Sequence, residues 1–240
     1  MKTVTVAACL LPMLAVAKVV PVEQASMASA PVPMMVLLAV MALVPFAILM
    51  LTSFSKIVVV LSIARSALGT QQAPPTMVLT GLAAVLSAHI MAPVVERMME
   101  KGRDVYSETA TTKEMLSAAA LVAEPMREFL IKHGSPEERA RFADMARELR
   151  PDSDSKLVTE EDLTVIVPAF VLTELKEAFI IGFLIFLPFL VLDMLVANVL
   201  LALGMQTLSP SQVSLPFKIL LFVAVDGWAL LSRGLILGYR

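Results

Sequence analysis

Seven ionisable side chains stand in an otherwise apolar stretch from Ile166 to Arg233, and these residues are the best placed in the chain to do chemistry. They are Glu174, Lys176, Glu177, Asp193, Lys218, Asp226 and Arg233. Ionisable groups in long apolar segments are costly unless they pair with each other or face protein or water. Their presence therefore indicates function or assembly.

Two of the carboxylates lie one helical turn apart, at Glu174 and Glu177. A paired-carboxylate site of this kind can act in general acid–base catalysis. However, Lys176 lies beside them and no acid–base partner is evident, so an ion pair between helices is favoured. Asp193 is either a proton-relay carboxylate of a transporter or a buried carboxylate held by hydrogen bonds to a neighbouring subunit. The second reading is favoured because its segment holds no other acid.

Lys218 follows Pro216, which predicts a position in the first turn of a helix. The helix dipole disfavours a cation there, so an acidic partner is expected, with Glu174 or Glu177 as the nearest candidates.

Three further residues close the stretch. Asp226 and Arg233 are seven residues apart, which predicts a pair within one helix or across an interface. Trp228 is the only tryptophan and is expected to anchor a protein contact or an interfacial belt.

No catalytic, metal-binding or nucleic-acid-binding pattern is present. The sequence has no Walker loop, no GxSxG elbow and no HExxH motif. Cys9 is the single cysteine, and His89 and His133 lack metal-ligand spacing. The net charge is −2, without a basic stripe interleaved with aromatic residues, which argues against a nucleic-acid partner. We therefore expect no enzyme activity, no metal and no other cofactor.

The elements that position these residues follow from the composition. The chain is 58% apolar with a mean hydropathy of +0.82, and 27 of its 40 charged residues lie between Glu96 and Asp162. The predicted organisation is an apolar N-terminus (1–30), a first apolar helical block (31–95), a charged helical insert (96–162) and a second apolar helical block (163–240). Met1–Ala17 is either a secretory signal, with Lys2 before an apolar run, or an uncleaved apolar N-terminus.

Glycine, proline and capping residues predict the helix limits. In the first block Pro31 and Pro33 mark the entry to a helix that continues as the apolar segment Val36–Leu51, with a kink at Pro45. The polar break Thr52–Ser55 is expected to cap a helix over Lys56–Leu68, and a further helix is expected over Thr76–Val95. In the insert, one helix ends at Gly134 and the next starts with a Ser135–Glu138 capping box. The fold class is therefore all-α, built from kinked apolar helical hairpins around a charged helical insert.

The second block contains two long apolar segments, Ala178–Leu203 and Val213–Leu237, separated by a break at Gly204. Both exceed the roughly 20 residues that cross a bilayer. Yet Pro188, Pro216 and the charges interrupt them, and the loops show no clear excess of Lys and Arg to set an orientation. The segments are better suited to protein neighbours than to lipid.

Several motifs in these blocks resemble the FliP/SctR family. In the first block they are Thr52-Ser-Phe-Ser-Lys-Ile57, Leu61-Ser-Ile-Ala-Arg-Ser-Ala-Leu-Gly-Thr-Gln-Gln-Ala-Pro-Pro75 and Ile90-Met-Ala-Pro93. In the second they are Glu174-Leu-Lys-Glu-Ala-Phe-Ile-Ile-Gly-Phe183, Leu187-Pro-Phe-Leu-Val-Leu-Asp193, Leu215-Pro-Phe-Lys218 and Asp226-Gly-Trp228. The match covers both apolar blocks in order, and the charged insert matches more loosely.

The resemblance implies a non-enzymatic core pore subunit of the type III secretion export gate, through which unfolded substrate proteins pass. It implies a homo-oligomer of five copies, joined by a related larger subunit and a small two-helix subunit into a helical, cone-like channel. Rod or needle components and the rest of the export apparatus would be further partners. The assembly would lie at the basal body in the bacterial inner membrane, with much of the protein at or above the periplasmic face.

Two sites are implied by the same resemblance. A channel constriction would be formed by Met205, Gln206, Thr207 and Leu208, and Glu174 and Lys218 would make charged contacts between neighbouring subunits. Ala197–Gly204, Leu208-Ser-Pro210 and the Gly234–Tyr239 ending resemble injectisome members, whereas the signal-like N-terminus and Pro125-Met-Arg-Glu-Phe129 resemble flagellar ones. On balance the injectisome is favoured over the flagellum. The alternative function is a proton-coupled or small-solute transporter that uses Asp193 and Asp226. We find no internal repeat to support it.

Overall fold

The structure is a computed structural model that describes residues 31–70, 73–105, 112–151 and 158–240, and every element in these ranges is a helix. This confirms the all-α prediction. The chain divides into two compact units, Met1–Leu49 and Met50–Arg240, which are described separately. Cys9 and the signal-like segment Met1–Ala17 lie outside the described residues.

The first unit contributes one helix, α2 (Pro31–Leu51), whose last two residues belong to the second unit. It carries no charge, contains Pro45 and exposes large apolar side chains such as Leu43 and Phe46. The predicted apolar helix, entered at Pro31 and Pro33 and continuing through Val36–Leu51, is confirmed.

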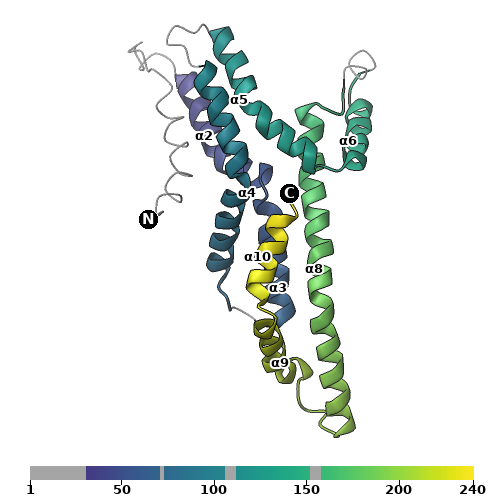
Figure 1. Cartoon of the computed structure of the whole chain (residues 1–240). Helices are drawn as coiled ribbons and strands as arrows, with labels where there is room; N and C mark the ends of the chain where they lie inside the picture. Colours follow the sequence, from purple (N-terminus) through teal and green to yellow (C-terminus); the bar gives the residue numbers. More distant parts are fainter. Residues whose placement is uncertain (1–30, 71–72, 106–111, 152–157) are drawn as a thin grey trace, which may run out of the picture. The chain divides into compact units, whose positions relative to one another are not determined.

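In the second unit, α3 (Phe54–Leu68) and α4 (Thr76–Val105) form the predicted hairpin (Figure 1). Helix α3 ends where Gly69 adopts the left-handed conformation with φ of 77°, which glycine reaches without a Cβ penalty. Helix α4 extends ten residues beyond the predicted end at Val95. The change from apolar to charged sequence at Glu96 therefore falls inside a helix.

The described part of the charged insert continues with α5 (Thr112–His133) and α6 (Pro136–Glu148), separated near Gly134 as predicted. The predicted capping box is wrong, because Ser135 makes no side-chain cap hydrogen bond. Instead, the backbone N–H of Ser135 donates to Thr173 Oγ1 at 3.0 Å. This bond ties the insert to the second apolar block.

Helix α8 (Leu163–Ala202) has 40 residues and is the longest element. At 1.5 Å per residue its length is about 60 Å. Pro168 and Pro188 lie inside it, and it packs along α3 and against α6 (Figure 1). The core of the unit lies where α8 meets α3, α4 and α5, around Ile57, Leu61, Phe129, Ile166 and Phe170.

The second predicted apolar segment, Val213–Leu237, is not one helix. It is divided between α9 (Pro210–Ala224) and α10 (Gly227–Leu237), which are bent by 58°. Asp226 occupies the bend with φ of 50°, and a Cβ on Gly227 would lie 2.3 Å from the ring of Phe222. The left-handed backbone and the close approach explain a break that hydropathy does not reveal.

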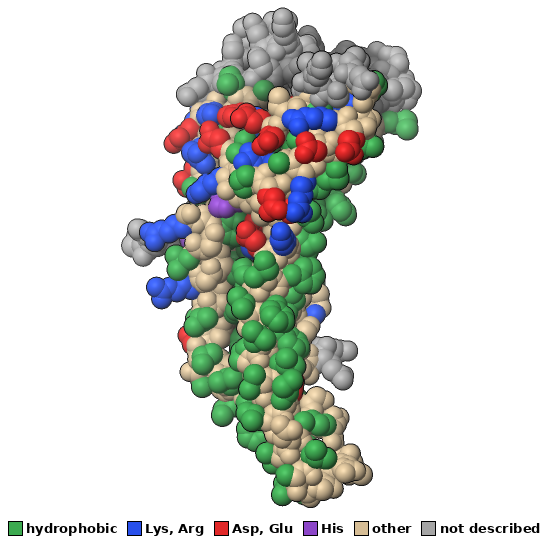
Figure 2. Space-filling model, turned by 90° about the vertical axis from the view of Figure 1, so that its right-hand side faces the viewer, with side chains coloured by type: hydrophobic (Ala, Val, Ile, Leu, Met, Phe, Trp, Pro, Cys, Tyr) green, Lys and Arg blue, Asp and Glu red, His purple; other side chains and the backbone are tan. Residues whose placement is uncertain are grey.

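The surface of the second unit is strongly segregated. Figure 2 shows charged side chains gathered at the end formed by the insert and apolar side chains along the rest of the exposed face. Among the described residues, the helical stretches Thr76–Arg103 and Leu163–Ala202 are long and apolar enough to cross a membrane, and the number rises to four if each bent helix pair counts as one span.

Candidate functional site: two buried charge clusters

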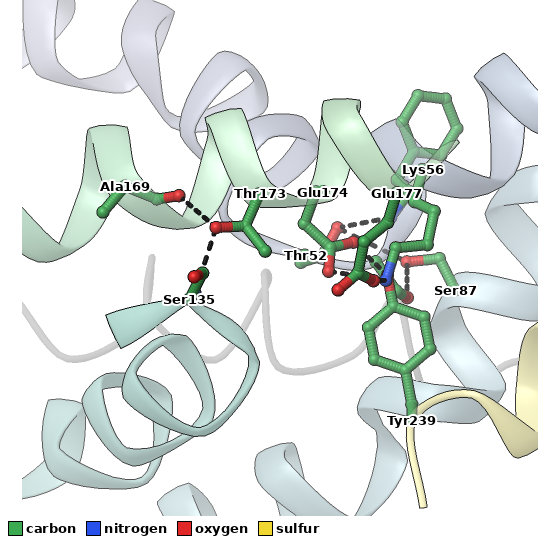
Figure 3. A network of polar contacts seen from close by, with 11 residues as sticks. Thr52, Lys56, Ser87, Ser135, Ala169, Thr173, Glu174, Glu177 and Tyr239 are labelled. Atoms are coloured by element: carbon green, nitrogen blue, oxygen red, sulfur yellow. Dashed lines mark hydrogen bonds and ion pairs between the residues drawn. The ribbon is translucent and has the colours of Figure 1, made fainter. Parts of the chain in front are cut away.

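The first cluster is centred on Lys56 in α3, which lies between two carboxylates of α8 (Figure 3). Its Nζ is 2.9 Å from Glu174 Oε1 and 2.6 Å from Glu177 Oε2. Because the two glutamates are one turn apart, a single lysine reaches both. The Glu174 side chain is 0% exposed, whereas that of Glu177 is 50% exposed. The expected ion pair between helices is present, and its cation is Lys56, not Lys176.

Tyr239, next to the C-terminus, completes this cluster. Its hydroxyl donates to Glu174 Oε2, and Lys56 Nζ lies 4.3 Å from the centre of its ring. The ring also stacks on Phe129 and contacts His133. The Lys56–Glu174 pair therefore holds the end of the chain against α3, α5 and α8. The sequence analysis did not identify Lys56 or Tyr239 as site residues. The signal for Lys56 was present, because it is the first charged residue after Glu23 in an otherwise apolar stretch.

Buried hydroxyl groups extend the polar contacts from α3 to α4. Ser53 donates to Ser87 at 3.1 Å, and Ser87 donates to Thr52 at 3.3 Å. The predicted cap is present only in part: Ser53 makes no side-chain cap bond, whereas Thr52 Oγ1 accepts from the backbone N–H of Phe54 at 3.4 Å. The hydroxyls of Thr52 and Ser53 also bond to Ser87 and so join the start of α3 to α4.

The second cluster joins α3, α8 and α9 through Lys218. Its Nζ is 2.6 Å from Asp193 Oδ2 and 3.3 Å from the carbonyl oxygen of Ala67, and Ser214 donates to Asp193 Oδ1. Helix α9 begins at Pro210, so Lys218 is in mid-helix and the predicted first-turn position is wrong. An acidic partner was expected for Lys218, and within the chain it is Asp193. The hydrogen bonds of Asp193 likewise come from its own chain.

Glu174 and Lys218 thus belong to different clusters of the same chain, each with its own ion-pair partner. The predicted contact between these two residues of neighbouring subunits stays a prediction.

The predicted constriction, Met205–Leu208, lies in the loop between α8 and α9, and all four of its residues are exposed. Gly204 opens the loop in the left-handed conformation with φ of 71°, and the N–H of Met205 donates to the carbonyl of Leu200 at 2.9 Å. The expected helix break at Gly204 is confirmed.

The remaining predicted residues are placed near the bend. Asp226 and Arg233 are both exposed, and among the described residues neither has an oppositely charged side chain within 4.0 Å. Trp228 is half-buried and packs edge-on against Phe222 at 5.1 Å. Trp228 is therefore a core contact that joins α9 and α10 within the chain.

Two groups outside the apolar helices have displaced pKa values. Burial, with Lys132 and Lys56 nearby, lowers the pKa of His133 to about 4. Hydrogen bonds from the N–H and hydroxyl of Thr159 lower the pKa of Asp162, the residue before α8. In the parts of the chain that the structure describes, no three His, Cys, Asp or Glu residues gather to hold a metal ion.

Both clusters do the same physical work, because each places a lysine of one helix against a carboxylate of α8. Neither arrangement pairs a nucleophile with a base. They account for five of the charged residues in the apolar blocks: Lys56, Glu174, Glu177, Asp193 and Lys218. Lys176 belongs to neither cluster and lies 3.6 Å from Glu138 of the insert.

Comparison with known proteins decides the family. Residues 37–235 match the model of the FliP family. The chain belongs to this family. The hypersensitivity response secretion protein HrcR of Ralstonia nicotianae is 44% identical over 209 residues, covering 86% of this chain and 96% of the relative. The Yop proteins translocation protein R of Yersinia pestis is 40% identical over 208 residues, with 86% and 95% covered.

A flagellar relative is equally similar. The flagellar biosynthetic protein FliP of Bacillus subtilis is 43% identical over 209 residues, covering 87% of this chain and 91% of the relative. The chain is therefore a FliP-family protein of the type III secretion export gate, as its motifs predicted, and both branches of the family are represented among its relatives.

Proposed function

We propose that this FliP-family chain is a core pore subunit of the export gate and forms, with further copies of itself, a channel for unfolded proteins. The observation that carries the proposal is the unpartnered apolar surface of α8 and α9 in a member of a secretion family. Its exposed side chains include Phe179, Phe183, Met194, Leu201, Phe217 and Leu220. Large exposed apolar patches mark surfaces that contact protein or membrane.

Helix α8 favours protein contacts over a simple lipid span. At about 60 Å it is twice the roughly 30 Å thickness of the hydrocarbon core, and tilting absorbs only part of the excess. Glu174 and Glu177 lie in its N-terminal half, next to the charged insert. We infer that the assembly lies at the basal body in the inner membrane, with this half of α8 at or above the periplasmic face.

The proposed assembly has five copies of the chain, the related larger subunit and the small two-helix subunit, next to rod or needle components. Within it, Lys218 of one copy contacts Glu174 of the next, which requires both side chains to leave the partners that they have inside the chain, Asp193 and Lys56. We expect Lys218→Glu to abolish secretion while the protein is still made, and Glu174→Lys to rescue it in part. The matched control is Lys218→Asp with Asp193→Lys, which rebuilds only the pair inside the chain. If this control restores secretion fully, the contact between subunits is refuted.

The constriction is tested by capturing a substrate in transit. A photo-crosslinker at Met205 should capture a secretion substrate that is stalled by a fused domain unable to unfold. The same crosslinker at Leu149, exposed on the insert, is the control. Equal capture at both positions, or none at Met205, would refute a pore lined by this loop.

We further propose the injectisome branch, on the basis of the Ala197–Gly204 and Gly234–Tyr239 sequences. The chain should restore secretion to a strain that lacks its injectisome relative and should not restore motility to a strain that lacks flagellar FliP. The reverse result would assign it to flagella.

A further inference from the structure

The charges around Lys56 do not balance. Lys56 is within 3 Å of both Glu174 and Glu177, so one cation faces two carboxylates. Glu174 is fully buried and also accepts a hydrogen bond from Tyr239. The surplus negative charge is therefore presented at the surface by Glu177, whose side chain is half exposed.

Glu177 stands at one end of an apolar surface that points away from the core. At spacings of three and four residues it is followed by exposed apolar side chains, and we call this set the α8 stripe: Glu177, Ile180, Leu184, Leu187, Val191 and Leu195. The stripe lies opposite the buried face of Ala178, Gly182 and Phe189 and is about 27 Å long at 1.5 Å per residue. Lys56 reaches this carboxylate from one side but shares its charge with Glu174, so a second cation on the exposed side would lower the cost of a carboxylate on this apolar surface.

Helix α10 has the complementary surface. The α10 face consists of the exposed residues Leu230, Arg233, Gly234 and Leu237, which share one side of the helix. Arg233 has no carboxylate within 4.0 Å among the described residues. A Cβ added to Gly234 would meet nothing within 4 Å, so another helix has room to approach closely beside the arginine.

We propose that the α8 stripe of one copy binds the α10 face of a second copy, with Glu177 pairing with Arg233. Each surface carries one charge of the sign that the other lacks: Glu177 shares the single cation Lys56 with Glu174, and Arg233 has no carboxylate within 4.0 Å among the described residues. The two surfaces belong to different helices, so the contact is heterologous and repeats from copy to copy, as a ring or a helical assembly requires. The inference rests on the proposed function only in assuming that the chain forms a homo-oligomer.

Cysteine cross-linking in membranes tests the contact, in a Cys9→Ser background. Glu177→Cys with Arg233→Cys should give a ladder of covalent oligomers under mild oxidation. The alternative pair, Asp226→Cys with Arg233→Cys, is the control, because Asp226 is the other exposed carboxylate of this region. Linking of the control pair alone would overturn the proposal.

Charge exchange tests the pairing itself. Glu177→Arg and Arg233→Glu should each lower the oligomer fraction on native gels about tenfold, and the double exchange should restore it. Glu148→Arg, on the exposed surface of α6, should leave it unchanged. If both single variants keep the oligomer fraction of the wild type, this contact is overturned but the proposed function stays intact. Absence of any oligomer when the partner subunits are present would instead refute the proposed function.

Discussion

Removing the cation of the first cluster is the sharpest test of how the fold is held together. The change Lys56→Met keeps most of the side-chain volume but leaves Glu174 as a buried carboxylate without its ion pair at 2.9 Å. Glu177 is half exposed and can turn to water, whereas Glu174 is 0% exposed and cannot. The free energy of unfolding should therefore fall mainly because of Glu174.

The magnitude follows from the burial of both partners. Breaking a buried pair by removing one member typically lowers the free energy of unfolding by about 3–5 kcal/mol. The hydrogen bond from Tyr239 still stabilises Glu174, so we expect a loss of about 3 kcal/mol. In a chain of this size that corresponds to a fall in Tm of about 6–12 °C. Replacing both residues, by Lys56→Met with Glu174→Met, should recover most of the loss, because apolar pairs often match buried ion pairs in stability.

The assay is thermal unfolding of the detergent-solubilised protein, analysed as a double-mutant cycle. The matched control is the pair Arg97–Glu128, which is also 2.9 Å long but has both side chains 51% exposed. Removing Arg97 should lower stability by less than about 1 kcal/mol. Two results would contradict the argument that burial makes the Lys56 cluster stabilising. One is an equal fall in Tm for Lys56→Met and the Arg97 control, and the other is a Tm of the double replacement no higher than that of Lys56→Met alone.

Three further predictions concern the same unit. Because the pKa of His133 is lowered from 6.5 to about 4, the unfolded chain takes up a proton before the folded chain does as the pH falls. The free energy of unfolding should therefore drop between pH 6.5 and 4, by about 1 kcal/mol after allowance for partial exposure of the imidazole. Melting curves of His133→Gln should show a smaller drop over the same pH range. Gly182→Ala should lower the free energy of unfolding by about 1–3 kcal/mol, because the new Cβ would lie 2.4 Å from Ile63 Cδ1. Gly81→Ala is the control: a Cβ there would meet no atom within 4 Å, so this change should be neutral or stabilising in the same melts. Tyr239→Phe should lower Tm in the wild type but much less when Glu174→Met is already present, and equal effects in both backgrounds would contradict its role as a hydrogen-bond donor.

The sequence predicted the helices well wherever glycine or proline marks their ends. Gly69, Gly134 and Gly204 all lie at the expected breaks, because positive φ or tight turns at these places depend on local chemistry. The limits that failed depend on tertiary structure. Helix α4 continues past Val95 into charged sequence, and the bend at Asp226 is a non-glycine residue in the left-handed conformation that propensity disfavours.

The charged residues of the site could be recognised from sequence, but their pairing could not. Periodicity places Glu174 and Glu177 on adjoining turns, yet it gives no information on which lysine lies opposite, since Lys56 is more than a hundred residues away. The sequence predicted an acidic partner for Lys218 and, separately, a buried carboxylate at Asp193. Joining them required the crossing of α8 and α9, which local patterns do not contain.

The pairings explain how α8 acquires a defined rotation about its own axis. The helix is apolar on almost all sides, so burial of apolar surface alone distinguishes poorly between one face and another. Lys56 holds Glu174, and Lys218 holds Asp193 further along the helix. Rotating α8 about its axis would separate both pairs and leave the two buried lysines without their carboxylates. That fixed rotation is also what directs the α8 stripe outward with Glu177 at its head. The buried pairs thus determine which apolar face is offered to a neighbour, so losing one of them should disturb assembly even where the chain still folds.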